Sequence, residues 1–255
     1  YLANQFRDAM ATVRTFGAPV LFLTFTANVH WPPIQREVAA LGATLSPYDR
    51  SDIVVRAFHI VLKRLEHDIK THEVFGKCVF FTRVVEEQKR GLVHAHFTIR
   101  LLRSIRANLE AWDRLICAEL PDPVRCPELF KTVCMHNIHR HTIHCAPNGP
   151  IAPGETCKKN FPRAFSAATT FDEKTGFPIY RRRGPAHGKV AVLDPDSGEM
   201  VDNSIVVPYN PYLTRRFEAH INVEVVTSLK SVKYLFKYTF KGHDRASLEM
   251  HHGDE

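Results

Sequence analysis

Residues 77–102, with the sequence KCVFFTRVVEEQKRGLVHAHFTIRLL, contain two apolar stretches separated by a polar segment with a glycine. Both stretches are rich in β-branched and aromatic residues, which favours β-strands over 77–85 and 92–102. The separating segment, Gln88-Lys89-Arg90-Gly91, is typical of a turn. The sequence therefore predicts an antiparallel β-hairpin.

Two histidines, His94 and His96, lie two positions apart in the second predicted strand. Side chains alternate between the faces of a strand, so both imidazoles point to the same face. Such a pair can bind a metal ion, and Glu86 or Gln88 of the first strand can supply an oxygen ligand. The alternative is that both are ordinary surface or hydrogen-bonded histidines, because the tripeptide alone is a weak signal.

The composition is that of a globular protein. Of the 255 residues, 44% are hydrophobic and 24% charged, which argues against a fully disordered chain. The most apolar run, residues 20–25, is too short to span a membrane. The 34 Lys and Arg exceed the 27 Asp and Glu by seven, which suits a polyanion partner, although many enzymes share this excess. The chain begins at Tyr1, and we expect it to be part of a longer protein.

Helices and further strands are predicted on both sides of the hairpin. Apolar residues at helical spacing from Val54 to Ile69 predict a helix capped by Ser51. The other predicted elements are a helix over 4–16, a strand over 19–26, a loop over 27–33, a helix over about 105–116, a strand over 219–226 and a helix from 227 to about 241. This order predicts an α+β fold with a mostly antiparallel central sheet flanked by helices.

The last predicted helix carries Tyr234 and Tyr238, which are four positions apart and share one helical face. A lysine, Lys237 or Lys241, follows each tyrosine after three positions. A tyrosine that attacks a phosphodiester needs its developing negative charge stabilised, because its free pKa is about 10. The pattern suits such a nucleophile; the alternative is an ordinary amphipathic helix.

A cluster of cysteine and histidine follows residue 130. His139, His141, Cys145 and Cys157 together offer two nitrogens and two sulfurs, a set that Zn²⁺ binds tetrahedrally. Rival ligands nearby are Cys134, His136 and His144. We predict a structural zinc site, because four protein ligands leave no open position for catalysis; the alternative is a merely histidine-rich loop.

Several long segments are informative when they are taken together and in order. They are GAPVLFLTFTAN at 17–28 followed by Trp31-Pro32, EEQKRGLVHAHF at 86–97, the segments 139–145 and 157–162, PYNP at 208–211 with HINVE at 220–224, and the pair Tyr234 and Tyr238. Over nearly the whole chain they resemble the Rep domain of Helitron transposases, members of the HUH endonuclease superfamily of the two-tyrosine type. One departure is Val93, where the family often has proline.

The resemblance implies a HUH/Rep-like fold with a ferredoxin/RRM-like core and a zinc-binding insertion. His94 and His96 would hold catalytic Mg²⁺ or Mn²⁺. The third ligand would be Glu86 or Gln88, and Gln88 is slightly favoured because it lies nearer the turn. Zn²⁺ would be structural.

The resemblance also implies a single-stranded DNA endonuclease and strand transferase of rolling-circle DNA transposition. Tyr234 or Tyr238 would attack the scissile phosphate and give a 5′-phosphotyrosine and a free 3′-hydroxyl, from which strands can be rejoined. Lys237 would stabilise the phenolate or the phosphate. The alternatives are a DNA-binding module with inactive chemistry and a HUH replication initiator of a plasmid or virus.

The expected partner is single-stranded DNA of the transposon ends and the target. Candidate DNA contacts are Asn28, Trp31, Lys241, Arg181, Arg182 and Arg183. The predicted domains are a nuclease core over 1–129 and 201–246, a zinc-finger-like insertion over 130–165 and a loop-rich insertion over 166–200. A helicase domain would follow outside this sequence. Six cysteines without a disulfide framework favour a reducing compartment, and we expect the nucleus.

Overall fold

The computed structural model describes residues 11, 13–42, 44–87, 92–102, 109–142, 145–146, 149, 152, 154–226 and 247–250. The predicted turn at 88–91 and the predicted helix at 227–241 lie outside the described residues, and so do Gln88, Tyr234, Lys237, Tyr238 and Lys241. Among the helices that are described, none is long and apolar enough to cross a membrane.

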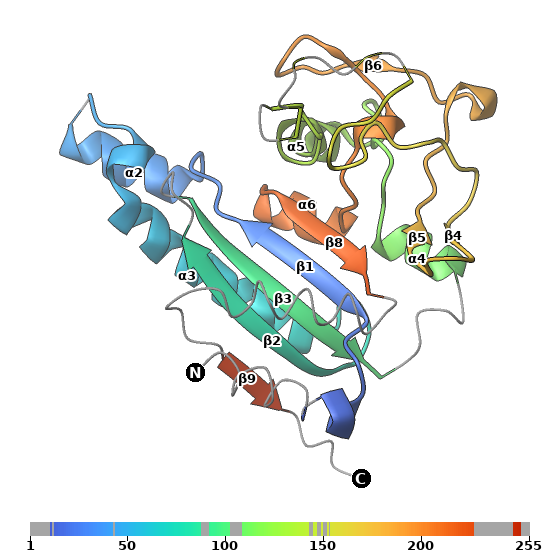
Figure 1. Ribbon diagram of the computed structural model, residues 1–255. Helices are drawn as coiled ribbons and strands as arrows, with labels where there is room; N and C mark the ends of the chain where they lie inside the picture. The colour runs from blue at the N-terminus through green and yellow to red at the C-terminus, as the bar shows by residue number, and fades with distance from the viewer. Residues whose placement is uncertain are drawn as a thin grey trace. The chain divides into compact units, whose positions relative to one another are not determined.

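Five strands form one antiparallel sheet in the spatial order β8-β1-β3-β2-β9 (Figure 1). Their bounds are β1 Leu21–Thr26, β2 Cys78–Glu87, β3 Val93–Leu101, β8 Ile221–Val225 and β9 Ser247–Met250. Strands β2 and β3 are the predicted hairpin, and β1 and β8 are the strands predicted over 19–26 and 219–226. The predicted α+β fold with an antiparallel sheet and flanking helices is confirmed.

One face of this sheet is apolar. Leu23 and Phe25 of β1 and Ala95 and Phe97 of β3 have no exposed surface. The side chains that alternate with them point to the opposite face, which places Thr24 and its neighbours there. The apolar face of the sheet therefore packs in the core, and the opposite face carries polar side chains.

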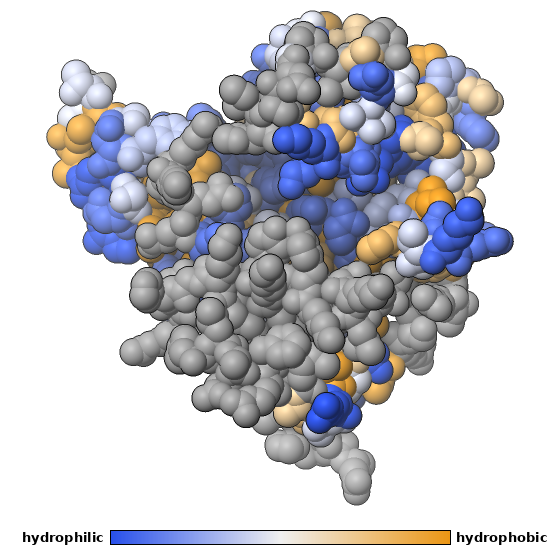
Figure 2. Space-filling model, viewed as in Figure 1, coloured by the Kyte–Doolittle hydropathy of each residue, from blue (hydrophilic) through white to orange (hydrophobic). Residues whose placement is uncertain are grey.

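Helix α3 (Ser51–Lys70) covers the apolar face, and α2 (Pro32–Leu41) packs beside α3 (Figure 1). The buried α3 residues Val54, Phe58, Leu62, Leu65 and Ile69 repeat at intervals of three or four, as predicted. The ring of Phe58 stacks on that of Phe25 of β1, with 5.1 Å between centroids. The surface around α2, at the left of Figure 2, has hydrophilic residues beside hydrophobic ones. Ser51 is the first helical residue, and the N-cap position belongs to Arg50.

The loop predicted over 27–33 is shorter than expected, because α2 begins at Pro32. Proline fixes φ near −65°, which suits a helix, and it lacks a backbone N–H. In the first turn of a helix the N–H groups have no partner within the helix, so the missing donor costs nothing there. Two further helices begin with proline, namely α5 (Pro127–His136) and α6 (Pro211–Phe217). The two prolines after Trp31 therefore start regular structure instead of ending it.

The chain divides into two units, residues 1–107 with 217–255 and residues 108–216. Unit 1 holds the five-stranded sheet with α2, α3 and the 3-10 turn Pro47–Asp49. Unit 2 holds α4 (Leu109–Leu115), α5, α6 up to Arg216, the hairpins β4–β5 (Thr170–Phe171, Pro178–Ile179) and β6–β7 (Val192–Leu193, Met200–Val201), and 3-10 turns at Pro185–His187 and Asn203–Ile205. Unit 2 thus contains residues 108–129 and 201–216 together with the cysteine and histidine segment. From the sequence, both ranges are predicted to belong to the nuclease core.

A small apolar core holds part of unit 2 together. Phe130, Val133 and Cys134 of α5 pack with Val206 and Tyr209. The Tyr209 hydroxyl donates to the Glu119 carbonyl at 2.9 Å. Helix α5 is not predicted from the sequence, where this region stands out only for its candidate metal ligands.

Candidate functional site

The polar face of the sheet brings together residues from four strands. In the antiparallel register, Thr26 of β1 and Glu86 of β2 both lie opposite His94 of β3. Thr24 lies opposite His96 on one side and opposite Asn222 of β8 on the other. Residues directly opposite in such a sheet have Cβ atoms about 4.5–5.5 Å apart, so these side chains form one continuous polar patch.

Two threonine hydroxyls orient the two imidazoles. The distance from Thr26 Oγ1 to His94 Nδ1 is 2.9 Å, and from Thr24 Oγ1 to His96 Nδ1 it is 3.1 Å. With the proton on Nδ1, each ring donates to its threonine and keeps a lone pair on Nε2. The rings lie nearly parallel, with 17° between planes and 6.5 Å between centroids, so both Nε2 atoms can serve one site.

The Nε2 atoms have the surroundings of metal ligands. His94 Nε2 is buried and has no hydrogen-bond partner among the described residues, which is costly for a polar atom unless a ligand satisfies it. His96 Nε2 lies 3.4 Å from Glu86 Oε2. Glu86, one of the two predicted third ligands, is therefore beside the histidine pair; Gln88, the favoured one, lies outside the described residues.

Burial keeps both imidazoles neutral near pH 7. Burial lowers the pKa of His94 to about 4, with a smaller contribution from the neighbouring His96 and His220. Burial also lowers the pKa of His96, although the Glu86 carboxylate opposes this shift. Neutral imidazoles bind metal without first losing a proton. Two nitrogens and one carboxylate oxygen leave further positions open, as a catalytic divalent ion requires.

Replacing Thr26 by valine is expected to weaken Mn²⁺ binding at this patch about 10- to 100-fold, because the isosteric side chain cannot hold Nδ1 of His94. Calorimetric titration of zinc-loaded protein measures the affinity. Thr26→Ser keeps the hydroxyl and is expected to bind as the wild type does. Thr82→Val is the control, since it removes a hydroxyl that contacts Thr98 instead of a histidine. Unchanged affinity in Thr26→Val would contradict the orienting role.

Two residues predicted to contact DNA are buried in unit 1. Trp31 is 7% exposed, its Nε1 donates to the Phe217 carbonyl at 2.8 Å, and its ring packs near Phe25. Asn28 is also 7% exposed, and its Nδ2 donates to the Glu218 carbonyl at 2.6 Å. Trp31 therefore has no ring face to offer to a base, and both side chains join the end of β1 to the segment before β8.

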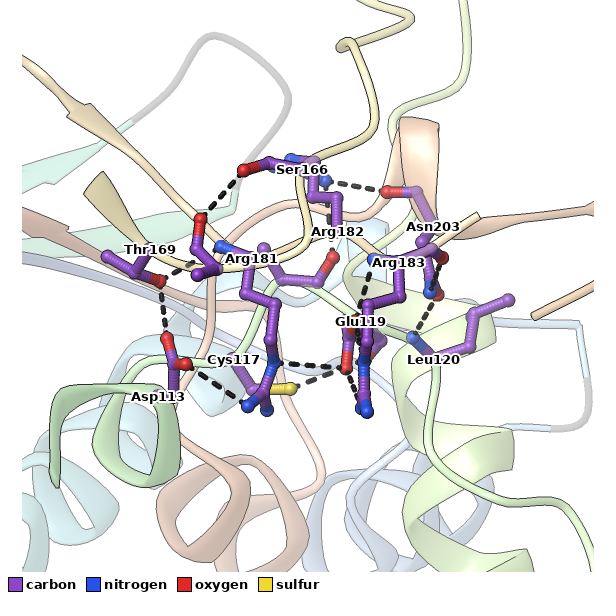
Figure 3. A network of polar contacts seen from close by, with 12 residues as sticks. Asp113, Cys117, Glu119, Leu120, Ser166, Thr169, Arg181, Arg182, Arg183 and Asn203 are labelled. Atoms are coloured by element: carbon purple, nitrogen blue, oxygen red, sulfur yellow. Dashed lines mark hydrogen bonds and ion pairs between the residues drawn. The ribbon is translucent and has the colours of Figure 1, made fainter. Parts of the chain in front are cut away.

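The three consecutive arginines predicted to contact phosphate belong to an internal network of unit 2 (Figure 3). Arg183 makes a bidentate pair with the Glu119 carboxylate, at 2.8 and 2.6 Å. Arg181 pairs with Asp113 at 3.1 Å and lies 3.5 Å from Glu119. Burial works against ionisation of Glu119, but the hydrogen bonds from Arg183 and the charges of Arg183 and Arg181 outweigh it and lower the pKa of Glu119.

Arg182 corrects the sequence analysis most clearly, because it is only 4% exposed. Its Nη1 donates to the carbonyls of Ala118, Asn203 and Val206 at 3.3, 2.7 and 2.6 Å. In this position the guanidinium joins three backbone segments and has no surface for a DNA phosphate. Arg181 and Arg183 are partly exposed, and their contact with DNA remains a prediction.

Replacing Arg182 by methionine is expected to destabilise unit 2 by about 3 kcal/mol or more, because buried carbonyls lose a charged donor. Thermal and urea unfolding measure the loss. Arg125→Met is the control, since that arginine is exposed in the same unit. A change in stability equal to that of the control would show that the buried guanidinium is dispensable.

The predicted zinc ligands His139, His141, Cys145 and Cys157 come together in unit 2. Their candidate ligand atoms all lie within 4.8 Å of one another. Cys145 Sγ is 3.7 Å from His139 Nε2 and 3.9 Å from His141 Nδ1, and Cys157 Sγ is 3.4 Å from His139 Nε2. A tetrahedral Zn²⁺ with its usual bond lengths separates nitrogen and sulfur by about 3.6 Å, so the group fits this metal.

The backbone around the two thiols supports negative charge on sulfur. The Thr142 N–H donates to Cys145 Sγ at 3.3 Å, and the Lys159 N–H donates to Cys157 Sγ at the same distance. The Thr142 N–H, followed by the His141 side chain, lowers the pKa of Cys145 to about 7. A tight turn from Cys157 holds the second thiol, and Asn160 takes the positive φ of 58° that the turn needs.

The rival ligands are not part of this group. Cys134 lies in the apolar core of unit 2, where burial raises its pKa to about 12. His136 is the last residue of α5 and is not among the four clustered side chains. His144 lies outside the described residues. The four ligands predicted from the sequence are therefore the four that the structure brings together.

The polar patch of unit 1, apart from Asn222 of β8, lies inside the segment that is similar to a known family. Residues 1–99 match the Helitron helicase-like domain at N-terminus. This match covers less than half of the chain and supports a Helitron-related protein. It includes Glu86, His94 and His96, whereas the cysteine and histidine group of unit 2 lies beyond it. No curated protein matches the chain.

The roles of Thr24 and Thr26 were missed by the sequence analysis. Both alternate with buried residues in β1, which is a signal for the polar face of a strand. Their contact with the histidines depends on β1 pairing with β3, and these strands are separated by two helices and β2. Only knowledge of the strand order could have identified them.

Proposed function

We propose that this chain is a metal-dependent single-stranded DNA endonuclease and strand transferase of a Helitron rolling-circle transposon. The observation that carries the proposal is the pair His94 and His96, whose Nδ1 atoms contact threonines. Nε2 of His96 lies beside the Glu86 carboxylate, and Nε2 of His94 is buried without a hydrogen-bond partner among the described residues. The match of residues 1–99 supports the assignment to Helitron-related proteins.

The residues of the patch fit a divalent ion. The buried, unpartnered Nε2 of His94 and the Glu86 carboxylate beside His96 offer nitrogen and oxygen ligands, which suit Mg²⁺ or Mn²⁺. When bound, such an ion would polarise the scissile phosphate and favour attack on it. His94, His96 and Glu86 would hold the ion, and Thr24 and Thr26 would keep the rings in the binding tautomer.

Tyr234 or Tyr238 would be the nucleophile. The phenolic oxygen attacks phosphorus and forms a P–O bond to tyrosine, while the bond from phosphorus to the 3′-oxygen breaks. The phenolic proton is lost, and the departing oxygen gains a proton to become a free 3′-hydroxyl. Lys237 would stabilise the phenolate. The reverse reaction with another 3′-hydroxyl rejoins strands without ATP, because the ester keeps the bond energy.

The name of the matched family suggests association with nucleic acid and a helicase in the full-length protein. We propose single-stranded DNA as the substrate, because a phosphate must reach an imidazole pair on a sheet surface. We further propose that the protein acts in the nucleus.

The test is a covalent adduct. The protein is incubated with Mn²⁺ and single-stranded oligonucleotides that carry candidate transposon ends, and a denaturing gel separates protein bound to DNA. We expect an adduct with the wild type and none with Tyr234→Phe plus Tyr238→Phe. Tyr48→Phe is the matched control, because that exposed tyrosine lies far along the chain from both.

Two outcomes would overturn the proposal. An adduct that survives in the double phenylalanine variant would exclude the tyrosine mechanism. No adduct with any end sequence would favour the alternative, a DNA-binding module with inactive chemistry.

A further inference from the structure

The side-chain amide of Asn222, on strand β8, is an unsatisfied polar group on the polar face of the sheet. Its Oδ1 is buried and has no hydrogen-bond partner among the described residues. Nε2 of His94, on the same face, is in the same situation. A buried polar atom without a partner is costly, so each such atom in a folded protein calls for an explanation. A metal ion explains the imidazole nitrogen, and Asn222 needs an explanation of its own.

Asn222 lies too far from the candidate metal centre to share its ion. It is opposite Thr24 of β1, which in turn is opposite His96 of β3. Glu86, the candidate oxygen ligand, is on β2, beyond β3. Neighbouring strands are about 4.8 Å apart, so about 14 Å separates β8 from β2, and the short side chains of Asn222 and Glu86 cannot meet at one ion. The amide is therefore available to the substrate.

The chemistry of the unpartnered atom selects the kind of ligand. The Oδ1 atom of an asparagine only accepts hydrogen bonds. A phosphodiester offers acceptor oxygens alone and cannot satisfy it. Adenine, cytosine and guanine each carry an amino group that donates, whereas thymine has none. The buried Oδ1 of Asn222 thus fits a nucleobase with an amino group.

An aromatic side chain on the same face provides a surface for such a base. Phe22 of β1 is partly exposed and lies diagonally across from both Asn222 and His96. Its ring is stacked on that of His96, with 5.6 Å between centroids and 9° between planes. Diagonal neighbours in a sheet are within reach of an aromatic side chain. Proteins that recognise unpaired bases combine aromatic rings with hydrogen bonds to base edges, which is the combination present here.

We propose that Asn222 recognises a base of the single-stranded substrate, close to the phosphate at the histidine pair. Its Oδ1 accepts a hydrogen bond from the amino group of that base, and Phe22 offers aromatic surface beside it. The amide makes binding depend on the DNA sequence near the scissile phosphate, which a metal ion and a tyrosine do not. This inference rests on the proposed single-stranded DNA substrate.

The experiment measures binding without strand cleavage. Fluorescence anisotropy follows dA, dC and dT oligonucleotides and an abasic strand of equal length over a series of salt concentrations, without added divalent ion. The variants are Asn222→Leu, which removes the amide, and Asn222→Asp, which keeps an acceptor oxygen. Thr82→Val is the control, because it removes a hydroxyl from the same face on the other side of β3.

Wild-type protein is expected to bind dA or dC about 10-fold more tightly than dT, which corresponds to about one hydrogen bond. In Asn222→Leu this ratio is expected to fall below about 3-fold. Its affinity for the abasic strand and its slope of log K against log salt are expected to stay unchanged, because no phosphate contact is lost. Asn222→Asp is expected to keep the ratio and to bind every strand more weakly, because it adds a negative charge. Thr82→Val is expected to bind as the wild type does.

Four results would overturn the inference. They are a base ratio unchanged in Asn222→Leu, a ratio lost in Asn222→Asp, an equal loss in the control, and an equal loss for the abasic strand. The last would show that the amide turns its Nδ2 to a phosphate. Circular dichroism and a melting curve check the fold of Asn222→Leu, and the result with Asn222→Asp decides if that variant does not fold.

The inference and the proposed function fail in different ways. If the base ratio does not depend on Asn222 while the covalent adduct still forms, only the base contact is refuted. If wild-type protein binds none of the four strands, both are refuted. If binding depends on Asn222 and no adduct forms, the base contact stands and the chain is a DNA-binding module.

Discussion

Replacing His94 by alanine is expected to reduce Mn²⁺-dependent formation of the covalent protein–DNA adduct about 1,000-fold or more. The reason is that the substitution removes a proposed metal ligand whose Nε2 is buried and unpartnered among the described residues, and whose Nδ1 contacts Thr26. Loss of a catalytic divalent ion removes several kcal/mol of charge stabilisation, and each 1.36 kcal/mol is a factor of ten in rate. The measurement is the adduct yield over time on a denaturing gel.

His30→Ala is the matched control, because His30 is an exposed histidine of the same unit. It is expected to form adduct at the wild-type rate. A calorimetric titration with Mn²⁺ should show loss of binding in His94→Ala and not in the control. If His94→Ala binds Mn²⁺ and forms adduct normally, the polar patch is not the metal centre.

Replacing Cys157 by serine is expected to remove zinc and unfold the segment from His139 to Arg163. Structural Zn²⁺ contributes about 10–16 kcal/mol of apparent binding free energy in small domains, and folding of the loop depends on it. Among the described residues of this segment, little apolar packing is available to replace the metal, since the local cluster consists of Cys145, Cys157 and Phe161 with two partly buried neighbours. Elemental analysis measures the zinc, and limited trypsin digestion reports new cleavage in the segment.

The control for this variant is Cys126→Ser, because Cys126 is an exposed free cysteine of unit 2. It should retain zinc and resist trypsin as the wild type does. Zinc retained at full stoichiometry in Cys157→Ser, or absent from wild-type protein purified without chelator, would refute the assignment of these four ligands to a zinc site.

Local sequence patterns predicted the elements of the sheet well. The hairpin, β1, β8 and the buried stripe of α3 follow from alternation and helical spacing, which depend on neighbouring residues only. The group of side chains that could hold zinc was also predicted from the sequence, because His139, His141 and Cys145 are close along the chain and share a short loop. The two prolines that begin α2 were misread, since the same residue can end one element and begin the next.

Longer-range partners were beyond the sequence. Arg182 looked like a surface cation because the carbonyls that it contacts lie far away along the chain. Trp31 looked like a stacking residue because nothing nearby in sequence shows that Phe25 and the Phe217 carbonyl enclose it. For both residues the sequence indicates which interactions the side chain can make, but it does not show that the side chain is buried.

The sequence by itself determined which residues can carry chemistry: His94 and His96 on one strand face, and the two cysteines and two histidines of unit 2. These depend on spacing within a single strand or loop, and the backbone geometry of such elements is uniform. Only the tertiary structure decided that Thr24 and Thr26 hold the imidazoles, that Glu86 lies beside His96, and that Asn222 joins the same face of the sheet. Those facts follow from strand order and helix packing, because burial and pairing bring together residues that are distant in sequence.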